Sequence, residues 1–182
     1  MAEHMLTWRD DGHDLTVLTV FGAVTNGKEE RLAEEHREVL FLFGEGISSW
    51  EMGFRDDAHE DREDDPREVV EALRLRIQQM EPDVVVLPVG IHHPDHVVVA
   101  QCFPMWRDPT LEPKVWRYEE LPYYVLYPDQ CLFTEDTAKA GWQLQGFVPH
   151  FTFKKALCRM YHSQWAPHLG RTVFAPERIW VP

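Results

Sequence analysis

A run of apolar residues at positions 83–90 constrains the fold more than any other stretch of the chain. The run reads Asp-Val-Val-Val-Leu-Pro-Val-Gly, with no alternation of polar and apolar side chains. A run of this kind predicts a strand that is buried on both faces, and such strands belong to parallel sheets covered by helices on both sides. We therefore predict an α/β fold with a mostly parallel sheet.

The rest of the chain alternates between helical and strand patterns. We expect one domain over residues 1–182, because this length suits a single core. Alternating elements give βαβ units with right-handed crossovers. The predicted helices are 2–10, 28–43, 66–80, 97–103 and 153–165, and the predicted strands are 15–21, 47–54, 84–89 and one or two within 114–127, with 128–150 irregular and 167–182 a tail.

Composition narrows the classes of partner. The net charge of −13 argues against nucleic acid or an anionic membrane as the main partner, since both require a basic surface. The three cysteines are widely spaced, which favours reduced thiols in a cytoplasmic protein. No apolar run reaches the length of a transmembrane helix, and the first residues lack the apolar core of a signal peptide.

Three histidines and an aspartate follow the strand at 84–89, in the order His92, His93, Pro94, Asp95, His96. In open α/β sheets, ligands bind beyond the carboxyl ends of the strands. His96 is a candidate zinc ligand, His93 a candidate oxyanion stabiliser or acid, and Asp95 the partner that orients His93. The competing interpretation is a solvent-exposed polar turn.

The sequence around these histidines resembles the second conserved motif of the LmbE-like, or PIG-L, zinc-dependent de-N-acetylases. The resemblance rests on residues 82–90 followed by His93-Pro94-Asp95-His96. It extends over nearly the whole chain. The further similar segments are the strand at 12–21, the Arg-x-x-Glu helix at 31–34, the Arg-Asp loop at 53–56, the Tyr-Glu-Glu-x-Pro-Tyr segment at 118–123, and the stretches 161–164 and 177–180.

The resemblance implies a Rossmann-like three-layer sandwich and a zinc-dependent hydrolase that removes an acetyl group from a small N-acetylated amino-sugar conjugate. It implies that His96 binds zinc and that His93, paired with Asp95, stabilises the tetrahedral intermediate. Arg31, Arg55 and Asp56 match positions near the sugar-binding side. For Arg31, ion pairing with Glu34 or Glu35 along the helix is the alternative.

The chain departs from the family pattern at its start. The family's first motif, His-Pro-Asp-Asp-Glu or a variant, supplies two metal ligands and the carboxylate base, and these 182 residues do not contain it. We expect the first strand to be missing, the domain to be N-terminally truncated, and the chain as written to hydrolyse nothing appreciable. Ile91 also stands where the family has an aromatic donor. An uncovered sheet edge would favour self-association into a homo-oligomer.

Two alternatives remain open from the sequence. The first is a non-catalytic α/β module that keeps a sugar-binding or regulatory role. The second is a rebuilt metal site that recruits His59 or His92 beside His96.

Overall fold

A computed structural model of the chain describes residues 1–23, 27–55, 64–103, 114–121, 123–130, 141–147, 151–160 and 175–182. The chain divides into two compact units. The first unit comprises residues 1–56 and 147–177, and the second comprises residues 57–146 and 178–182.

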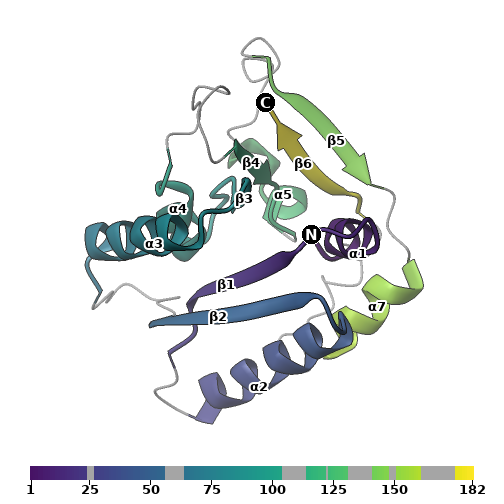
Figure 1. Cartoon of the computed structure of the whole chain (residues 1–182), viewed down its shortest axis with the longest axis horizontal. Helices are drawn as coiled ribbons and strands as arrows, with labels where there is room; N and C mark the ends of the chain where they lie inside the picture. The colour runs from purple at the N-terminus through teal and green to yellow at the C-terminus, as the bar shows by residue number, and fades with distance from the viewer. Residues whose placement is uncertain are drawn as a thin grey trace. The chain divides into compact units, whose positions relative to one another are not determined.

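A pair of parallel strands forms the centre of the first unit. Strand β1 (Leu15–Phe21) pairs with β2 (Ile47–Phe54), and α2 (Gly27–Leu42) connects them. The helix runs along the strand pair in Figure 1. Helix α1 (Ala2–Asp10) precedes β1, and Gly12, at φ +86°, adopts the left-handed conformation that ends the helix and turns the chain.

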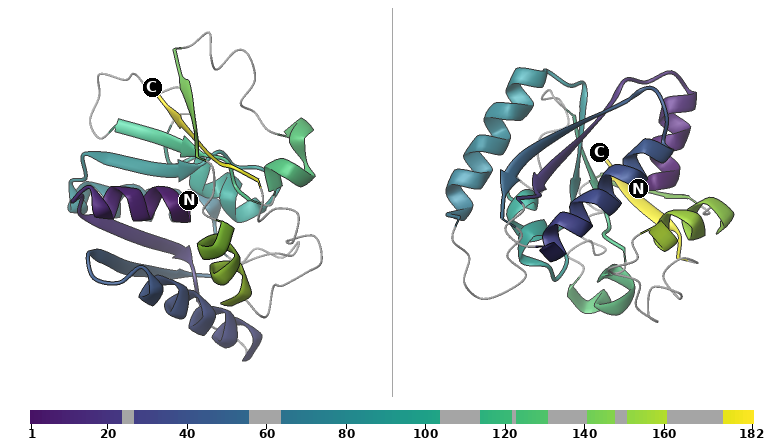
Figure 2. Two further views of the ribbon diagram at one scale, coloured as in Figure 1. Left: turned by 90° about the vertical axis from the view of Figure 1, so that its right-hand side faces the viewer. Right: turned by 90° about the horizontal axis from the view of Figure 1, so that it is seen from below.

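Helix α7 (Phe151–Met160) packs against α2 and closes the core of the first unit. The views of Figure 2 show α7 near the C-terminal end of α2. Val39 and Phe43 meet Leu157 in this core, and Met5 and Leu6 of α1 pack at its edge. The apolar positions of α2 recur at helical spacing, and this is why one face of the helix is buried.

The second unit contains a sheet with the strand order β3-β4-β6-β5. Strand β3 (Val84–Pro88) pairs in parallel with β4 (Lys114–Tyr118), while β4 pairs antiparallel with β6 (Glu177–Val181). The remaining elements are α3 (Pro66–Met80), α4 (Pro94–Ala100), the short α5 (Tyr123–Leu126), a single turn of 3₁₀ helix η1 (Pro128–Gln130), and β5 (Gln143–Phe147).

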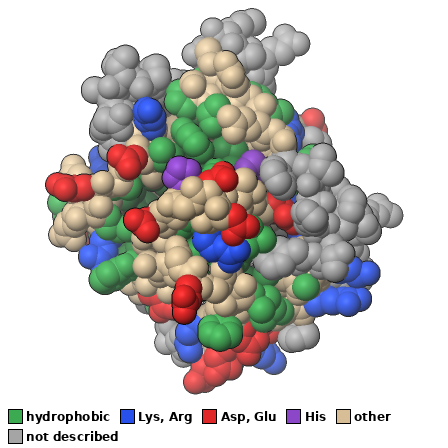
Figure 3. Space-filling view, turned by 45° about the vertical axis from the view of Figure 1, so that its right-hand side comes forward, with side chains coloured by type: hydrophobic (Ala, Val, Ile, Leu, Met, Phe, Trp, Pro, Cys, Tyr) green, Lys and Arg blue, Asp and Glu red, His purple; other side chains and the backbone are tan. Residues whose placement is uncertain are grey.

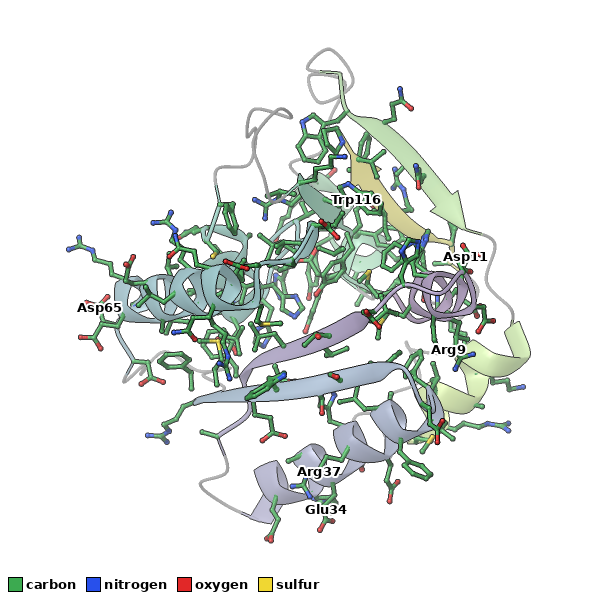
Figure 4. The ribbon with its side chains drawn as sticks, viewed as in Figure 1. Arg9, Asp11, Glu34, Arg37, Asp65 and Trp116 are labelled. Carbon is green, nitrogen blue, oxygen red and sulfur yellow. The ribbon has the colours of Figure 1, made fainter. Side chains whose placement is uncertain are left out.

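Local sequence signals explain the start and end of α3. The side chain of Asp65 accepts a hydrogen bond from the backbone N–H of Arg67 at 2.9 Å, and Pro66 occupies the first helical position. Figure 4 labels Asp65 at this end of the helix. The helix buries Val69, Leu73 and Ile77. It ends at Glu81, whose φ of +47° places it in the left-handed region just before Pro82.

Most of the predicted elements are confirmed, with shifted ends. Helix α4 begins at Pro94 rather than 97, because His93 caps it and Pro94 suits its first position. Of the one or two strands predicted within 114–127, one is present as β4, and residues 123–126 form the short helix α5. Two predictions were wrong, because residues 128–150 contain β5 and the predicted tail contains the buried strand β6.

The predicted α/β class is confirmed, since parallel strand pairs alternate with helices in both units. Strand β3 differs in burial from the expectation. Its valines are half-buried rather than enclosed, because β4 is its one strand partner among the described residues. A single-domain organisation stays a prediction. No helix in the described part of the chain is both long and apolar enough to cross a membrane.

Candidate functional site

The histidine cluster lies in the second unit, where β3 and β4 end. Because the two strands are parallel, the residues that follow them lie at the same edge of the sheet. These residues are the loop from Val89 to His93 and the two glutamates Glu119 and Glu120. The hydrogen bond from Val89 N to Tyr118 O, at 3.0 Å, extends the pairing into this region. The sheet therefore brings the loop and the glutamates together.

Glu120 holds the first residues of the loop. Its Oε1 accepts hydrogen bonds from Gly90 N at 2.7 Å and from Ile91 N at 3.0 Å. The side chain is buried, with 2% of the residue exposed. A buried carboxylate needs such donors, because leaving water without them costs several kilocalories per mole. Glu120 therefore sets the path of the chain from β3 into α4.

Gly90 allows this path. Its φ of +92° lies in the left-handed region, and a Cβ built on it would stand 3.0 Å from Ala100 Cβ and 3.3 Å from Val97 Cα of α4. A side chain at position 90 would therefore meet both backbone strain and a clash with the helix that carries His96.

We expect Gly90→Ala to destabilise the protein by about 2–4 kcal/mol through strain and overpacking together. Urea unfolding measures the change. Gly141→Ala is the matched control, because Gly141 has a similar φ of +89° with nothing within 4 Å of its Cβ position. The control should lose about 1–2 kcal/mol, from strain alone. Equal losses in both variants would show that packing against α4 is unimportant.

His93 caps α4, and this role fixes its geometry. The backbone N–H of Asp95 donates to His93 Nδ1 at 3.3 Å. The Asp95 carboxylate is buried, with 4% of the residue exposed, and its Oδ2 lies 3.9 Å from the same nitrogen. That separation exceeds hydrogen-bond range, so the carboxylate acts on His93 as a nearby charge. Because Nδ1 accepts a hydrogen bond, the proton of the neutral ring is on Nε2, which can donate.

Aromatic rings surround the histidines. The rings of His93 and His96 have centroids 5.3 Å apart, and Tyr123 of α5 lies 6.0 Å from His93 and 5.4 Å from His96. His92 stacks on Tyr127 at 3.8 Å. It adopts φ +63°, an unusual conformation for a residue with a side chain, and its Nδ1 lies 3.3 Å from Gln130 Oε1. The segment that follows β4 therefore places side chains beside all three histidines.

The other predicted site residues belong to the first unit or fall outside the described residues. Arg31 is exposed on α2, and Arg55 is half-buried just after β2, both in the first unit. Asp56 and His59 are outside the described residues. Ile91 is fully buried, with 0% of its surface exposed, and packs with Val89, Trp142 and Trp180. It cannot replace an aromatic donor in contact with a ligand.

The described residues do not complete a zinc site by themselves. A hydrolytic zinc site needs three protein ligands, and no group of three or more His, Cys, Asp or Glu side chains suited to a metal is present among the described residues. The ring of His92 stacks on that of Tyr127. Cys102 is buried, and burial raises the pKa of its thiol to about 11, so it stays protonated.

Sequence reasoning missed the contributions of Glu120, Tyr123 and Tyr127. The signal for Glu120 was present in the order of the chain, because two consecutive glutamates directly follow β4, which pairs in parallel with the strand before the histidines. The two tyrosines fell in a segment that was predicted to be a strand and that turns instead into α5.

Comparisons with known proteins identify the fold. No family model matches the chain, and neither does any curated protein. Among solved structures, a deacetylase of teicoplanin biosynthesis in complex with bog is similar, with a TM-score of 0.73 and 15% sequence identity over 97% of this chain and 90% of that chain. The A40926 pseudoaglycone deacetylase Dbv21 is similar with a TM-score of 0.67 and 19% identity over 98% of this chain and 88% of its own.

The zinc-inhibited form of the teicoplanin deacetylase Orf2 is a third similar structure, with a TM-score of 0.69 and 15% identity over 97% of this chain and 90% of that chain. At these identities the likeness establishes the fold. The chain therefore has an α/β fold that is also found in deacetylases.

Proposed function

We propose that the protein is a hydrolase of the zinc-dependent de-N-acetylase type, acting on a small N-acetylated amino-sugar conjugate. The observation that supports this most strongly is the position of the histidine cluster at the carboxyl end of β3, in a fold that is also found in deacetylases. In this proposal His96 is a metal ligand, and His93 with Asp95 stabilises the tetrahedral intermediate. Arg31, Arg55 and Asp56 bind the substrate.

The geometry of His93 supports its role in this proposal. With Nδ1 accepting the Asp95 amide, Nε2–H is a hydrogen-bond donor for a developing oxyanion. The buried carboxylate of Asp95, 3.9 Å away, stabilises the ring electrostatically if it gains a proton. Both effects come from residues within one turn of α4.

We further propose that the chain of 182 residues is impaired or inactive by itself, because its sequence contains no His-x-Asp-Asp motif to supply two metal ligands and the base. Two further proposals follow from the sequence: a cytoplasmic location and self-association into a homo-oligomer.

The test is to purify the chain and measure zinc content and acetate release from N-acetylglucosamine conjugates. We expect substoichiometric zinc and no acetate above the rate of a His96→Ala variant. Stoichiometric zinc together with acetate release would contradict the proposed inactivity. The DNA upstream of the first codon is a second test, since an in-frame His-x-Asp-Asp preceded by an apolar strand would predict an active enzyme.

A non-catalytic sugar-binding or regulatory module is the second candidate. The finding that favours it is that no group of three metal-binding side chains occurs in the described part of the chain. This candidate predicts saturable binding of an N-acetylated sugar conjugate that is unchanged by a chelator. Calorimetric titration with and without the chelator separates the two candidates, because binding that requires metal supports the deacetylase site.

A further inference from the structure

Glu120 has one oxygen that the loop does not use. Its Oε1 accepts from Gly90 N and Ile91 N, whereas Oε2 is buried and has no hydrogen-bond partner among the described residues. A buried polar atom without a partner costs free energy, so such atoms in folded proteins call for an explanation. For Glu120, the explanation is the side chain of His96, which lies beside its carboxylate.

His96 has the complementary atom. Its Nδ1 is buried and also lacks a hydrogen-bond partner within the described part of the chain, and it lies 3.5 Å from Glu120 Oε1. At this separation the contact does not meet the geometry of a hydrogen bond. The last torsion angles of a glutamate and of a histidine are broad, so a small rotation of either group brings a carboxylate oxygen into range.

Glu120 is held in place for this contact, while its neighbour is engaged elsewhere. Glu119 accepts from Trp180 Nε1 at 2.8 Å and pairs with Arg178 Nη1 at 2.9 Å. The two consecutive glutamates therefore face different partners. Glu119 joins β6, and Glu120 joins the loop and the histidine at the start of α4.

We propose that Glu120 is a positioning residue of the candidate site: it accepts the Nδ1 proton of His96 and so leaves Nε2 as the unprotonated nitrogen. The proposal rests on the proposed function, which assigns His96 a role as a ligand. A carboxylate bonded to one ring nitrogen fixes both the tautomer and the orientation of an imidazole. The same carboxylate sets the loop through Gly90 and Ile91, so one side chain organises both parts of the cluster.

The experiment determines the tautomer of His96 by long-range ¹H–¹⁵N NMR on metal-free protein labelled at histidine. The pH is set about 2 units above the usual histidine pKa of about 6.5, a choice that favours neutral imidazole rings. A His96→Gln variant assigns the signals among the ten histidines of the chain. We expect the wild-type ring of His96 to carry its proton mainly on Nδ1.

Glu120→Gln should move that proton. The amide oxygen of glutamine would keep the two bonds to the loop, which leaves its NH₂ group to donate to His96 Nδ1, so the main tautomer becomes Nε2–H. Glu119→Gln is the matched control, because it removes a buried charge one residue away, and it should leave His96 unchanged. A wild-type ring protonated mainly on Nε2 would overturn the proposal, as would an unchanged tautomer in folded Glu120→Gln.

The wild-type measurement decides the question even if Glu120→Gln fails to fold. The readout involves neither zinc nor substrate, so it is independent of the tests of hydrolysis. The expected tautomer would support the positioning role of Glu120 whether or not the chain releases acetate. The tests of hydrolysis address the proposed function independently.

Discussion

Replacing Arg117 by methionine is expected to destabilise the protein by about 3–5 kcal/mol, because it leaves buried carbonyl groups without donors. Arg117 lies on β4 and is fully buried, with 0% of its surface exposed. Its guanidinium donates to Pro88 O and Ala100 O, each at 3.1 Å, and to Phe103 O at 2.8 Å. It thereby joins the end of β3 to the end of α4, on both sides of the histidine loop.

The charge of Arg117 is itself costly to bury. Burial lowers the pKa of its guanidinium to about 10, although the nearby Glu120 carboxylate opposes the shift. Arg117→Met removes this buried charge and its desolvation cost. The expected loss of stability is therefore smaller than the summed cost of leaving three buried carbonyl groups without donors. Arg117→Lys should lose nearly as much as Arg117→Met, because an ammonium group cannot reproduce the planar fork that reaches separate carbonyls.

Urea unfolding followed by circular dichroism measures both variants. Arg67→Met is the matched control, since Arg67 is exposed at the start of α3 and its side chain should contribute within about 0.5 kcal/mol. A loss below about 1 kcal/mol in Arg117→Met would show that water or a shift of the backbone replaces the lost donors.

The elements with a clear local pattern were predictable from the sequence. Helix α3 has its cap, its proline and its apolar stripe within one short segment. Strand β6 was missed because no local sequence pattern indicates that it is a buried strand. Residues 177–181 carry charges at their start, and their burial depends on pairing with β4, which lies far away in the sequence.

The candidate site shows the same division. His93, Asp95 and His96 are close in sequence, and a single helix turn brings them together. Glu120 and Tyr123 lie beside them because β3 and β4 pair in parallel. The sequence alone does not reveal which strands pair, so it could not place these two residues at the site. Arg31 and Arg55 belong to the first unit, so their part in substrate binding stays a prediction.

The first unit contains a buried charge cluster around Glu177, and Glu177→Gln is expected to lower stability by about 3–5 kcal/mol. Glu177 is buried, and its Oε2 lies 2.9 Å from the Met1 ammonium and accepts from Glu3 N at 3.0 Å. The buried Lys154 approaches Oε1 at 3.8 Å and donates to Ala175 O at 2.9 Å. Removing the carboxylate would leave the partly exposed Met1 ammonium and the buried Lys154 without their anion.

The loss should depend on pH. Burial alone would raise the pKa of Glu177, but the Met1 ammonium and Lys154 outweigh it, and the pKa lies below its usual value of 4.5. A carboxylate whose pKa is lower in the folded state than in the unfolded state contributes stability above the unfolded value. That contribution disappears as the pH falls through the folded value.

The difference in stability between wild type and Glu177→Gln should therefore shrink in solutions more acidic than a pH of about 4.5, as the carboxylate gains a proton. It should shrink again at higher pH as the Met1 ammonium, whose pKa burial lowers from 8.0, loses its proton. Urea unfolding of the untagged chain across this range measures it. Glu34→Gln is the matched control, because it makes the same change of charge outside the cluster. Glu34 is exposed on α2 and labelled in Figure 4, and its replacement should change stability very little. Figure 3 shows other acidic side chains at the molecular surface. A pH-independent difference for Glu177→Gln would mean that the carboxylate stabilises the unit through packing rather than through its charge.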